Sequence, residues 1–172
     1  MLSIRPAVAE DVCLILDFIR DLAEYERAPD SAVATEADLL RDGFGPEPKF
    51  KCVIASWDGT PAGFALYFYN YSTWQGRPGI YLEDLFVRLQ YRGKGIGKAL
   101  LIYLAQVAVR EKCGRFQWAV LDWNTPSIKF YESLGAKILK EWLTMRVEGE
   151  DIQKLANQPS VTDRRSSVSG NR

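Results

Sequence analysis

The stretch from Gln90 to Lys98, "QYRGKGIGK", constrains the fold of this chain more than any other. Its three glycines stand directly before the apolar run "ALLIYLAQVAV" and follow the apolar segment "IYLEDLFV". Glycine is unfavourable inside a helix, but it permits the left-handed backbone conformations that tight turns need. The stretch therefore predicts a strand, a glycine-rich turn and a helix in succession, with the helix running from about residue 95 to residue 112.

The glycines also give this turn a possible chemical use. The first turn of a helix presents unpaired backbone N–H groups and the positive end of the helix dipole. Without side chains in the way an anion can approach these groups, and Arg92, Lys94 and Lys98 add positive charge. The stretch does not match a P-loop or the dinucleotide-binding motif. It predicts either a pyrophosphate site or an ordinary tight connection between a strand and a helix.

The composition removes much catalytic chemistry. The 172 residues include no histidine, which excludes Ser-His-Asp triads, Cys-His pairs and HExxH zinc sites. A formal net charge of zero gives no reason to expect nucleic acid or a membrane surface as a partner.

The cysteines and the N-terminus bear on location. The three cysteines are widely spaced and form no CxxC pair, so neither a disulfide framework nor a metal site is predicted. Cys13 and Cys52 are expected to be small core residues. The N-terminus does not resemble a signal peptide, and no apolar run is long enough to span a membrane. We therefore expect a reducing, cytoplasmic location.

Hydrophobic periodicity predicts one layered domain. Strands are expected at residues 2–6, 51–57, 62–71, 80–87 and 115–121, with one or two more within 137–148. Helices are expected at residues 10–25, 35–43, 95–112 and 126–133. Antiparallel hairpins come first and two βα units follow, which indicates an α+β (mixed α/β layered) fold. The domain spans residues 1–150, and a tail at 151–172 is predicted to be mostly disordered.

Two segments together resemble the GNAT N-acetyltransferases. "RGKGIG" after "YLEDLFV" is similar to the acyl-CoA-binding segment of that family, and "LDWNTPSIKFYESLGA" to its second motif. The resemblance implies a central, mostly antiparallel sheet with a splayed parallel pair and no metal. The pantetheine arm of acetyl-CoA would lie in the gap between these two strands, and its pyrophosphate would lie on the glycine turn. The implied acetyl-CoA contacts are Leu85, Phe86, Val87, Arg92, Gly93, Lys94, Gly95, Ile96, Gly97, Lys98, Asn124, Pro126, Ser127 and Phe130.

The resemblance also suggests which residues handle protons. Tyr131 is the candidate general acid, because aminolysis of a thioester expels a thiolate that a nearby phenol can protonate. An amine is almost wholly protonated at neutral pH, so something must accept a proton from it. Glu83 is the candidate base or substrate anchor, and strand alternation places Asp84 on the opposite face. The alternatives are a core tyrosine for Tyr131 and a solvated charge for Glu83.

Further matches resemble the spermidine/spermine (diamine) acetyltransferases over residues 2–148, nearest the branch that acts on thialysine. These are "LAEYE", "DGFG", "YRGKGIG" and W-N-x-P-S-I-x-F-Y. The resemblance implies a homodimer, direct acetyl transfer in a ternary complex, and a small cationic amine that contacts Tyr25, Glu26, Trp74, Glu83 and Trp123. Ser72 stands where the polyamine-preferring branch has an acidic residue. Two alternatives remain: a protein or antibiotic amine as acceptor, and a non-catalytic sensor of acyl-CoA.

Overall fold

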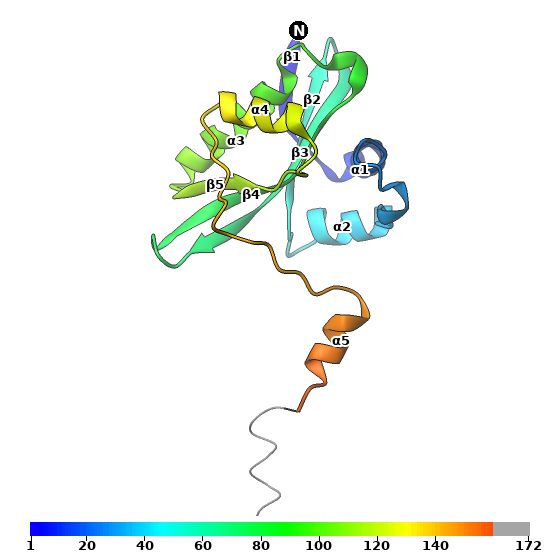
Figure 1. Cartoon of the computed structure of the whole chain (residues 1–172). Coiled ribbons are helices and arrows are strands. Elements are labelled where there is room, and N and C mark those ends of the chain that lie inside the picture. Colours follow the sequence, from blue (N-terminus) through cyan, green and yellow to red (C-terminus); the bar gives the residue numbers. More distant parts are fainter. Residues whose placement is uncertain (160–172) are drawn as a thin grey trace, which may run out of the picture. The chain divides into compact units, whose positions relative to one another are not determined.

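The computed structural model describes residues 1–159 and contains one five-stranded sheet in the order β1-β2-β3-β4-β5 (Figure 1). The strands are β1 (Leu2–Pro6), β2 (Lys51–Trp57), β3 (Thr60–Ser72), β4 (Arg77–Val87) and β5 (Arg115–Trp118). The helices are α1 (Val12–Tyr25), α2 (Glu36–Phe44), α3 (Ile96–Arg110), α4 (Thr125–Ser133) and α5 (Glu150–Ala156). Three short 3-10 turns, η1 (Ala9–Asp11), η2 (Pro29–Ser31) and η3 (Leu89–Tyr91), connect them.

The sheet is mixed, as the sequence predicts. Neighbouring strands pair antiparallel from β1 to β4, whereas β4 and β5 pair in parallel. The β2–β3 hairpin turns at Asp58 and Gly59, which both have positive φ angles. A parallel pair needs a long crossover, and α3 supplies it between β4 and β5. This arrangement confirms the α+β class.

Residues 1–122 form one compact unit around this sheet, with helices on both faces. Figure 1 shows α1 and α2 on one side of the sheet and α3 on the other. On the α1 side, Phe18 of α1 stacks on Phe64 of β3 with ring centroids 5.2 Å apart. Ile54 and Phe86 belong to the same buried cluster. This cluster fixes the face of β4 that carries Phe86 against α1.

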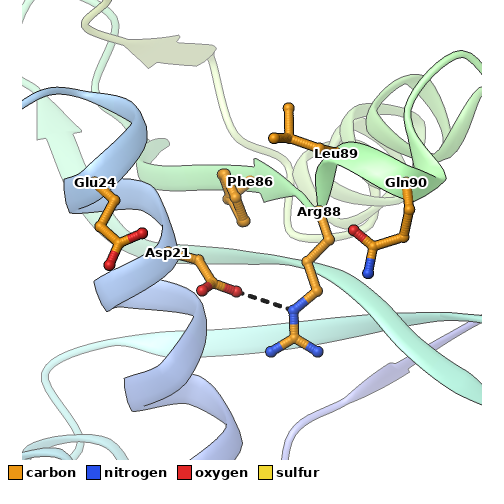
Figure 2. A pocket seen from close by; sticks show the side chains of 6 residues that line it. All are labelled: Asp21, Glu24, Phe86, Arg88, Leu89 and Gln90. Atoms are coloured by element: carbon orange, nitrogen blue, oxygen red, sulfur yellow. Dashed lines mark hydrogen bonds and ion pairs between the residues drawn. The ribbon is translucent and has the colours of Figure 1, made fainter.

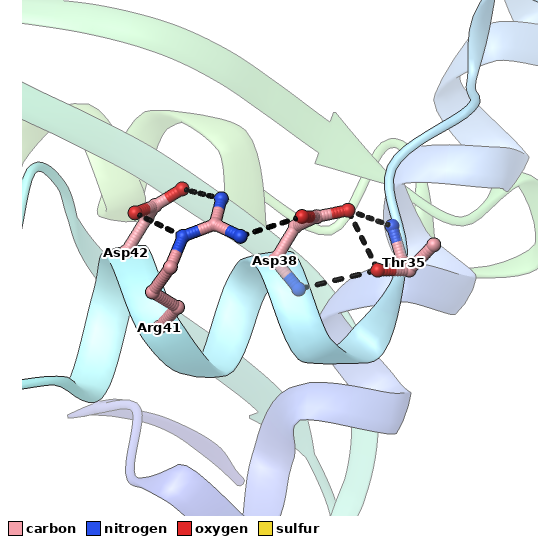
Figure 3. Close-up of polar contacts among 4 residues, drawn as sticks. All are labelled: Thr35, Asp38, Arg41 and Asp42. Atoms are coloured by element: carbon pink, nitrogen blue, oxygen red, sulfur yellow. Dashed lines mark hydrogen bonds and ion pairs between the residues drawn. The ribbon is translucent and has the colours of Figure 1, made fainter.

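A capping box formed by Thr35 and Asp38 starts α2, near the predicted start of a helix at residue 35 (Figure 3). The Asp38 N–H donates to Thr35 Oγ1 at 3.2 Å, and the Thr35 N–H donates to Asp38 Oδ2 at 3.1 Å. Arg41, one turn later, donates to the carboxylates of Asp38 and Asp42. These contacts satisfy N–H groups that an uncapped helix end would leave unpaired.

The end predicted for this helix at Gly43 is wrong. Helix α2 continues through Gly43 and ends at Phe44. A Cβ atom at residue 43 would lie 2.4 Å from the ring of Phe50. Glycine is therefore needed there for close packing, and it does not terminate the helix.

Several other predictions differ from the structure. Strand β5 ends at Trp118 instead of residue 121, and residues 137–148 form no strand. Alternating apolar residues make a strand only where an edge is available for pairing, and Trp142, Leu143 and Met145 are exposed here. Helix α5 lies in the part of the chain expected to be disordered. The rest of that predicted tail, residues 160–172, lies outside the described residues. Cys13 is exposed, whereas Cys52 is buried as expected.

Gly63 offers a test of how tightly β3 supports the end of β4. A Cβ atom at residue 63 would lie 2.5 Å from the carbonyl oxygen of Phe86. We expect Gly63→Ala to lower the free energy of unfolding by about 1–3 kcal/mol, because backbone must move. Chemical denaturation measures this, and hydrogen exchange at Phe86 and Val87 should quicken.

Gly76→Ala is the matched control for this prediction. Its φ is positive, but no atom lies within 4 Å of the added Cβ. It should therefore leave exchange at Phe86 and Val87 unchanged. A Gly63→Ala variant as stable as the wild type would show that the two strands are loosely packed at this point.

Candidate active site

The glycine turn forms the N-terminal end of α3. Gly93 and Gly95 have φ angles of 77° and 78°, and Gly95 is the N-cap residue of the helix. A side chain at either position would meet no atom within 4 Å, so backbone conformation and not crowding requires glycine here. Ile96 is buried and anchors the first turn. The backbone N–H groups of Gly97 and Lys98 in this first turn suit an anion.

Two basic side chains of the turn lie over aromatic rings. The Arg92 guanidinium carbon is 4.3 Å from the ring centroid of Tyr25, at the end of α1. The Lys94 ammonium is 4.9 Å from the ring centroid of Trp57, at the end of β2. The turn is thus held against two other elements of the same unit.

Strand β4 contains a bulge at Glu83. Asp84 pairs with Leu66 of β3 and Leu82 pairs with Tyr67, so Glu83 is the extra residue between them. Directly paired residues share a face of the sheet. Asp84 therefore lies on the α1 face with Leu66, whereas Leu82 and Tyr67 lie on the α3 face. Simple alternation would have put Leu82 and Asp84 on the same face.

The parallel pairing stops at the same place. The last pair between β4 and β5 is Leu82 with Trp118, while β4 itself continues to Val87. From Glu83 onward, the edge of β4 that faces away from β3 has no pairing with β5. This edge includes Leu85, Phe86 and Val87, whose backbone groups were expected to bind the pantetheine arm.

Two carboxyl groups act on a third, that of Asp84, beside the bulge. Burial is the main cause that raises the pKa of Asp84 to about 7, and the charges of Glu83 and Glu26 raise it further. Desolvation also raises the pKa of Glu26, which caps the end of α1. Glu83 itself is exposed. The structure therefore brings the predicted residues Glu26 and Glu83 together with Asp84, which the sequence argument had assigned to the opposite face.

A hollow of about 350 Å³ opens between α1 and the end of β4 (Figure 2). Arg88 crosses it, and its Nε donates to Asp21 Oδ2 at 2.9 Å. Its lining is Asp21, Glu24, Phe86, Arg88, Leu89 and Gln90. The hollow thus lies between the last turns of α1 and the end of β4, and one ion pair crosses it.

The β3–β4 turn carries two further residues of interest. Trp74 is 88% exposed at its tip. Ser72 is buried, and its Oγ accepts a hydrogen bond from the Gln75 N–H at 3.3 Å. The hydroxyl therefore serves the turn itself.

The second motif belongs to a separate unit that begins at Trp123. Asn124 is 6% exposed and caps α4, since its Oδ1 accepts from the Ser127 N–H at 3.3 Å. Pro126 lies in the first turn of the helix, as predicted. Phe130 and Tyr131 follow with ring centroids 5.3 Å apart. The two rings are partly buried, and Trp123 is exposed.

Comparison with known proteins assigns this arrangement to a family. Residues 15–136 match the acetyltransferase (GNAT) family. The chain belongs to the GNAT acetyltransferases. It is 42% identical over 166 residues to thialysine N-epsilon-acetyltransferase of Sus scrofa, covering 90% of this chain and 97% of that protein. It is 33% identical over 198 residues to an L-ornithine N5-acetyltransferase of Arabidopsis thaliana, covering 88% and 86%. An integron cassette protein of V. cholerae has a TM-score of 0.77 at 30% identity, covering 91% of this chain and 98% of that one.

Membership makes this chain an enzyme of the GNAT type, with acetyl-CoA as the acetyl donor and an amine as the acceptor. The resemblance in the sequence is thereby confirmed, and so is the fold that it implied. Within residues 1–159, no helix is both long and apolar enough to cross a membrane. The same residues contain no group of three potential metal ligands of the His, Cys, Asp or Glu type.

The sequence alone does not identify Asp84 as a half-buried acid of this GNAT site. Two consecutive carboxylates inside an otherwise apolar strand were the available signal. Alternation alone assigns them to opposite faces but does not reveal that Glu83 is the extra residue of a bulge. The bulge depends on β3, whose register is visible only in the folded sheet.

Asp84 makes a testable contribution to pH dependence. Its pKa rises from an ordinary value of 3.8 to about 7 in the folded protein, so the folded state binds the proton more tightly than the unfolded chain. The resulting stability is fully present below about pH 4 and is lost as the pH rises toward 7. Between pH 4.5 and 7.5, we expect the free energy of unfolding of the wild type to fall relative to Asp84→Asn by more than about 1 kcal/mol.

Chemical denaturation at both pH values measures this difference. Asp17→Asn is the control, because Asp17 is an exposed carboxyl on α1. It should leave the pH dependence of the wild type unchanged. If Asp84→Asn also follows the wild type, Asp84 ionises as an exposed carboxyl would.

Proposed function

We propose that this enzyme transfers an acetyl group from acetyl-CoA to a primary amine of a small cationic substrate such as thialysine, a diamine or a polyamine. Transfer is direct, within a ternary complex. The observation that carries the proposal is the bulge at Glu83, which coincides with the end of the pairing of β4 with β5 and lies beside three carboxyl groups. Relatives that share most of this chain's length are named for thialysine, for ornithine and for spermidine/spermine.

The donor side of the proposed site starts at the same bulge. Beyond Glu83, the backbone groups on the open edge of β4 can form hydrogen bonds with the amides of a pantetheine arm, as they would with a neighbouring strand. The pyrophosphate would bind at the backbone N–H groups from Gly93 to Lys98, where the glycines permit close approach. The further proposed acetyl-CoA contacts are Asn124, which caps α4, and Pro126, Ser127 and Phe130 of that helix.

The acceptor side is suited to cations. Glu26, Glu83 and Asp84 provide negative charge, and aromatic faces such as those of Tyr25, Trp74 and Trp123 can hold ammonium groups. The carboxylates have a second use, because an amine must lose a proton to attack the thioester. Glu83 is the proposed base, directly or through water. Asp84 has a pKa of about 7 and so can also exchange a proton at neutral pH.

Tyr131 is the proposed general acid. As the amine attacks the carbonyl carbon, the C–S bond breaks and the thiolate leaves with the electron pair. The phenol supplies the proton that this sulfur takes up. Tyr131 lies on α4, a helix that Asn124 caps and that has Pro126 in its first turn, so its backbone has a defined place within its unit.

Ser72 supports a preference of the enzyme for short amines over long polyamines. The branch that prefers polyamines has an acidic residue here, whereas the Ser72 hydroxyl is buried and used by the turn. No charge from residue 72 is thus available for a distant ammonium group. We also propose that the enzyme is a homodimer in which both subunits shape the substrate site.

A panel of amines tests the proposed acceptor. Thiol release from acetyl-CoA would be measured with thialysine, lysine, ornithine, putrescine, spermidine, spermine and an N-terminal peptide. We expect the highest kcat/KM with thialysine or a short diamine. Preference for spermidine or spermine would overturn the branch assignment. Acetylation of the peptide alone would point to a protein acceptor, and binding of acetyl-CoA without release would point to a sensor.

Tyr131→Phe tests the proposed acid separately. Because the variant keeps the ring and loses only the proton donor, we expect kcat to fall by about 100-fold or more. The dissociation constant for CoA, measured by calorimetry, should stay within about threefold of the wild type. Phe130→Leu is a control that alters the neighbouring ring without removing the phenol. A Tyr131→Phe enzyme with normal kcat would assign the acid to another group.

A further inference from the structure

We propose that Arg92 is a positioning residue that holds Tyr25 in place for the amine, so that the glycine turn supports both halves of the site. This rests on the proposed function, in which Tyr25 contacts the substrate. The resemblance to other GNAT enzymes assigned Arg92 to acetyl-CoA alone. The structure adds a second partner for it, at the end of α1.

Three contacts fix the Arg92 side chain. Its guanidinium carbon is 4.3 Å from the ring centroid of Tyr25 and 5.5 Å from that of Phe86. Its Nε donates a hydrogen bond to the carbonyl oxygen of Val87 at 2.9 Å. The two rings are themselves tilted together, with centroids 6.4 Å apart. Arg92 therefore joins the end of α1 to the end of β4.

These contacts suit arginine and no other residue type. A planar guanidinium can stack on a ring while its Nε–H donates a hydrogen bond at the edge. A lysine ammonium could approach the ring, but it is compact and has no planar fork with which to keep both contacts. Lysine at residue 92 should therefore restore the charge without restoring the position of Tyr25.

Tyr25 needs such support because of its place in the chain. It is the last residue of α1, and Glu26 is the C-cap. Arg27 then takes a left-handed conformation with a φ of 63°, so the helix cannot continue. Side chains at a helix end have fewer neighbours than those inside, and helix ends fray. The Arg92 guanidinium adds a charged neighbour to the contacts that the ring already makes with Phe86 and the core.

A second arginine of the same connection holds α1 one turn earlier. Arg88 pairs with Asp21, as Figure 2 shows, and its guanidinium lies 4.6 Å from the ring centroid of Phe18. Asp21 and Tyr25 are four residues apart and thus lie on one face of α1. Arg88 and Arg92 therefore hold successive turns of that face. The first contact is anchored in the core through Phe18, and the second reaches the proposed amine site.

A double-mutant cycle tests the inference. The KM for the amine would be measured at saturating acetyl-CoA, so that weaker binding of the donor does not enter. Tyr25→Leu and Arg92→Ala should each raise this KM about 10-fold, the size of a cation–π contact of roughly 1.4 kcal/mol. The double variant should resemble Tyr25→Leu, since Arg92 has no ring left to position once Tyr25 is lost. Independent effects would multiply to about 100-fold and would overturn the proposal.

Two variants test whether Arg92 acts by positioning Tyr25 or only through its positive charge. Arg92→Lys should behave like Arg92→Ala, and a lysine that restores the KM would overturn the inference. Tyr25→Phe keeps the ring, so the Arg92→Ala effect should persist in its background. The matched control is Lys94→Ala, because Lys94 lies in the same turn but contacts Trp57 instead. Its effect should multiply with that of Tyr25→Leu.

A measurement without turnover keeps this inference distinct from the proposed function. The Arg92 Nε–H can be followed by ¹⁵N nuclear magnetic resonance and assigned by its loss in Arg92→Lys. It should be protected from exchange with water in the wild type and in Tyr25→Phe, and exposed in Tyr25→Leu. Unchanged protection in Tyr25→Leu would overturn the inference. Failure to acetylate any amine would overturn the proposed function alone.

Discussion

One extra residue in β4 determines where chemistry can take place in this protein. Strand pairing fixes which face each side chain occupies, and a bulge resets that pattern from one residue to the next. Here the reset occurs at Glu83, between Leu82 on the α3 face and Asp84 on the α1 face. The parallel pairing with β5 ends at the same place. The strand edge that opens and the carboxylates beside it therefore lie at one point of β4.

The partial burial of Asp84 shows the energetic consequence of this arrangement. A carboxyl in a poorly hydrated place keeps its proton more tightly, and two further carboxylates strengthen that effect. A sheet built for stability alone would place an apolar residue at this position. Perturbed carboxyl groups of this kind are more frequent at functional sites than elsewhere. The acid cluster destabilises the folded state at neutral pH, and the packed rings of Phe18 and Phe64 nearby help to offset that cost.

The glycine turn has two kinds of neighbour. Its backbone faces outward at the start of α3, where the left-handed Gly93 and Gly95 leave room for an anion. Its side chains point back to the rest of the sheet unit, to Tyr25 through Arg92 and to Trp57 through Lys94. Arg88, just before the turn, adds an ion pair to Asp21. In the proposed site, the glycine turn thus contacts both the acetyl-CoA side and the amine side.

The amino-acid sequence by itself determined the class of fold and the family. The glycine turn after an apolar strand, the capping box at Thr35 and the motif from Asn124 to Tyr131 depend on neighbours a few residues apart, so they are visible in one dimension. Only the tertiary structure decided what depends on distant partners. The face of Asp84 depends on β3, the contact of Arg92 depends on α1, and the strand predicted within 137–148 does not form in the described chain. Hydrophobic periodicity in the sequence indicates which residues could face a core. Pairing between strands and packing between helices decide which of them do.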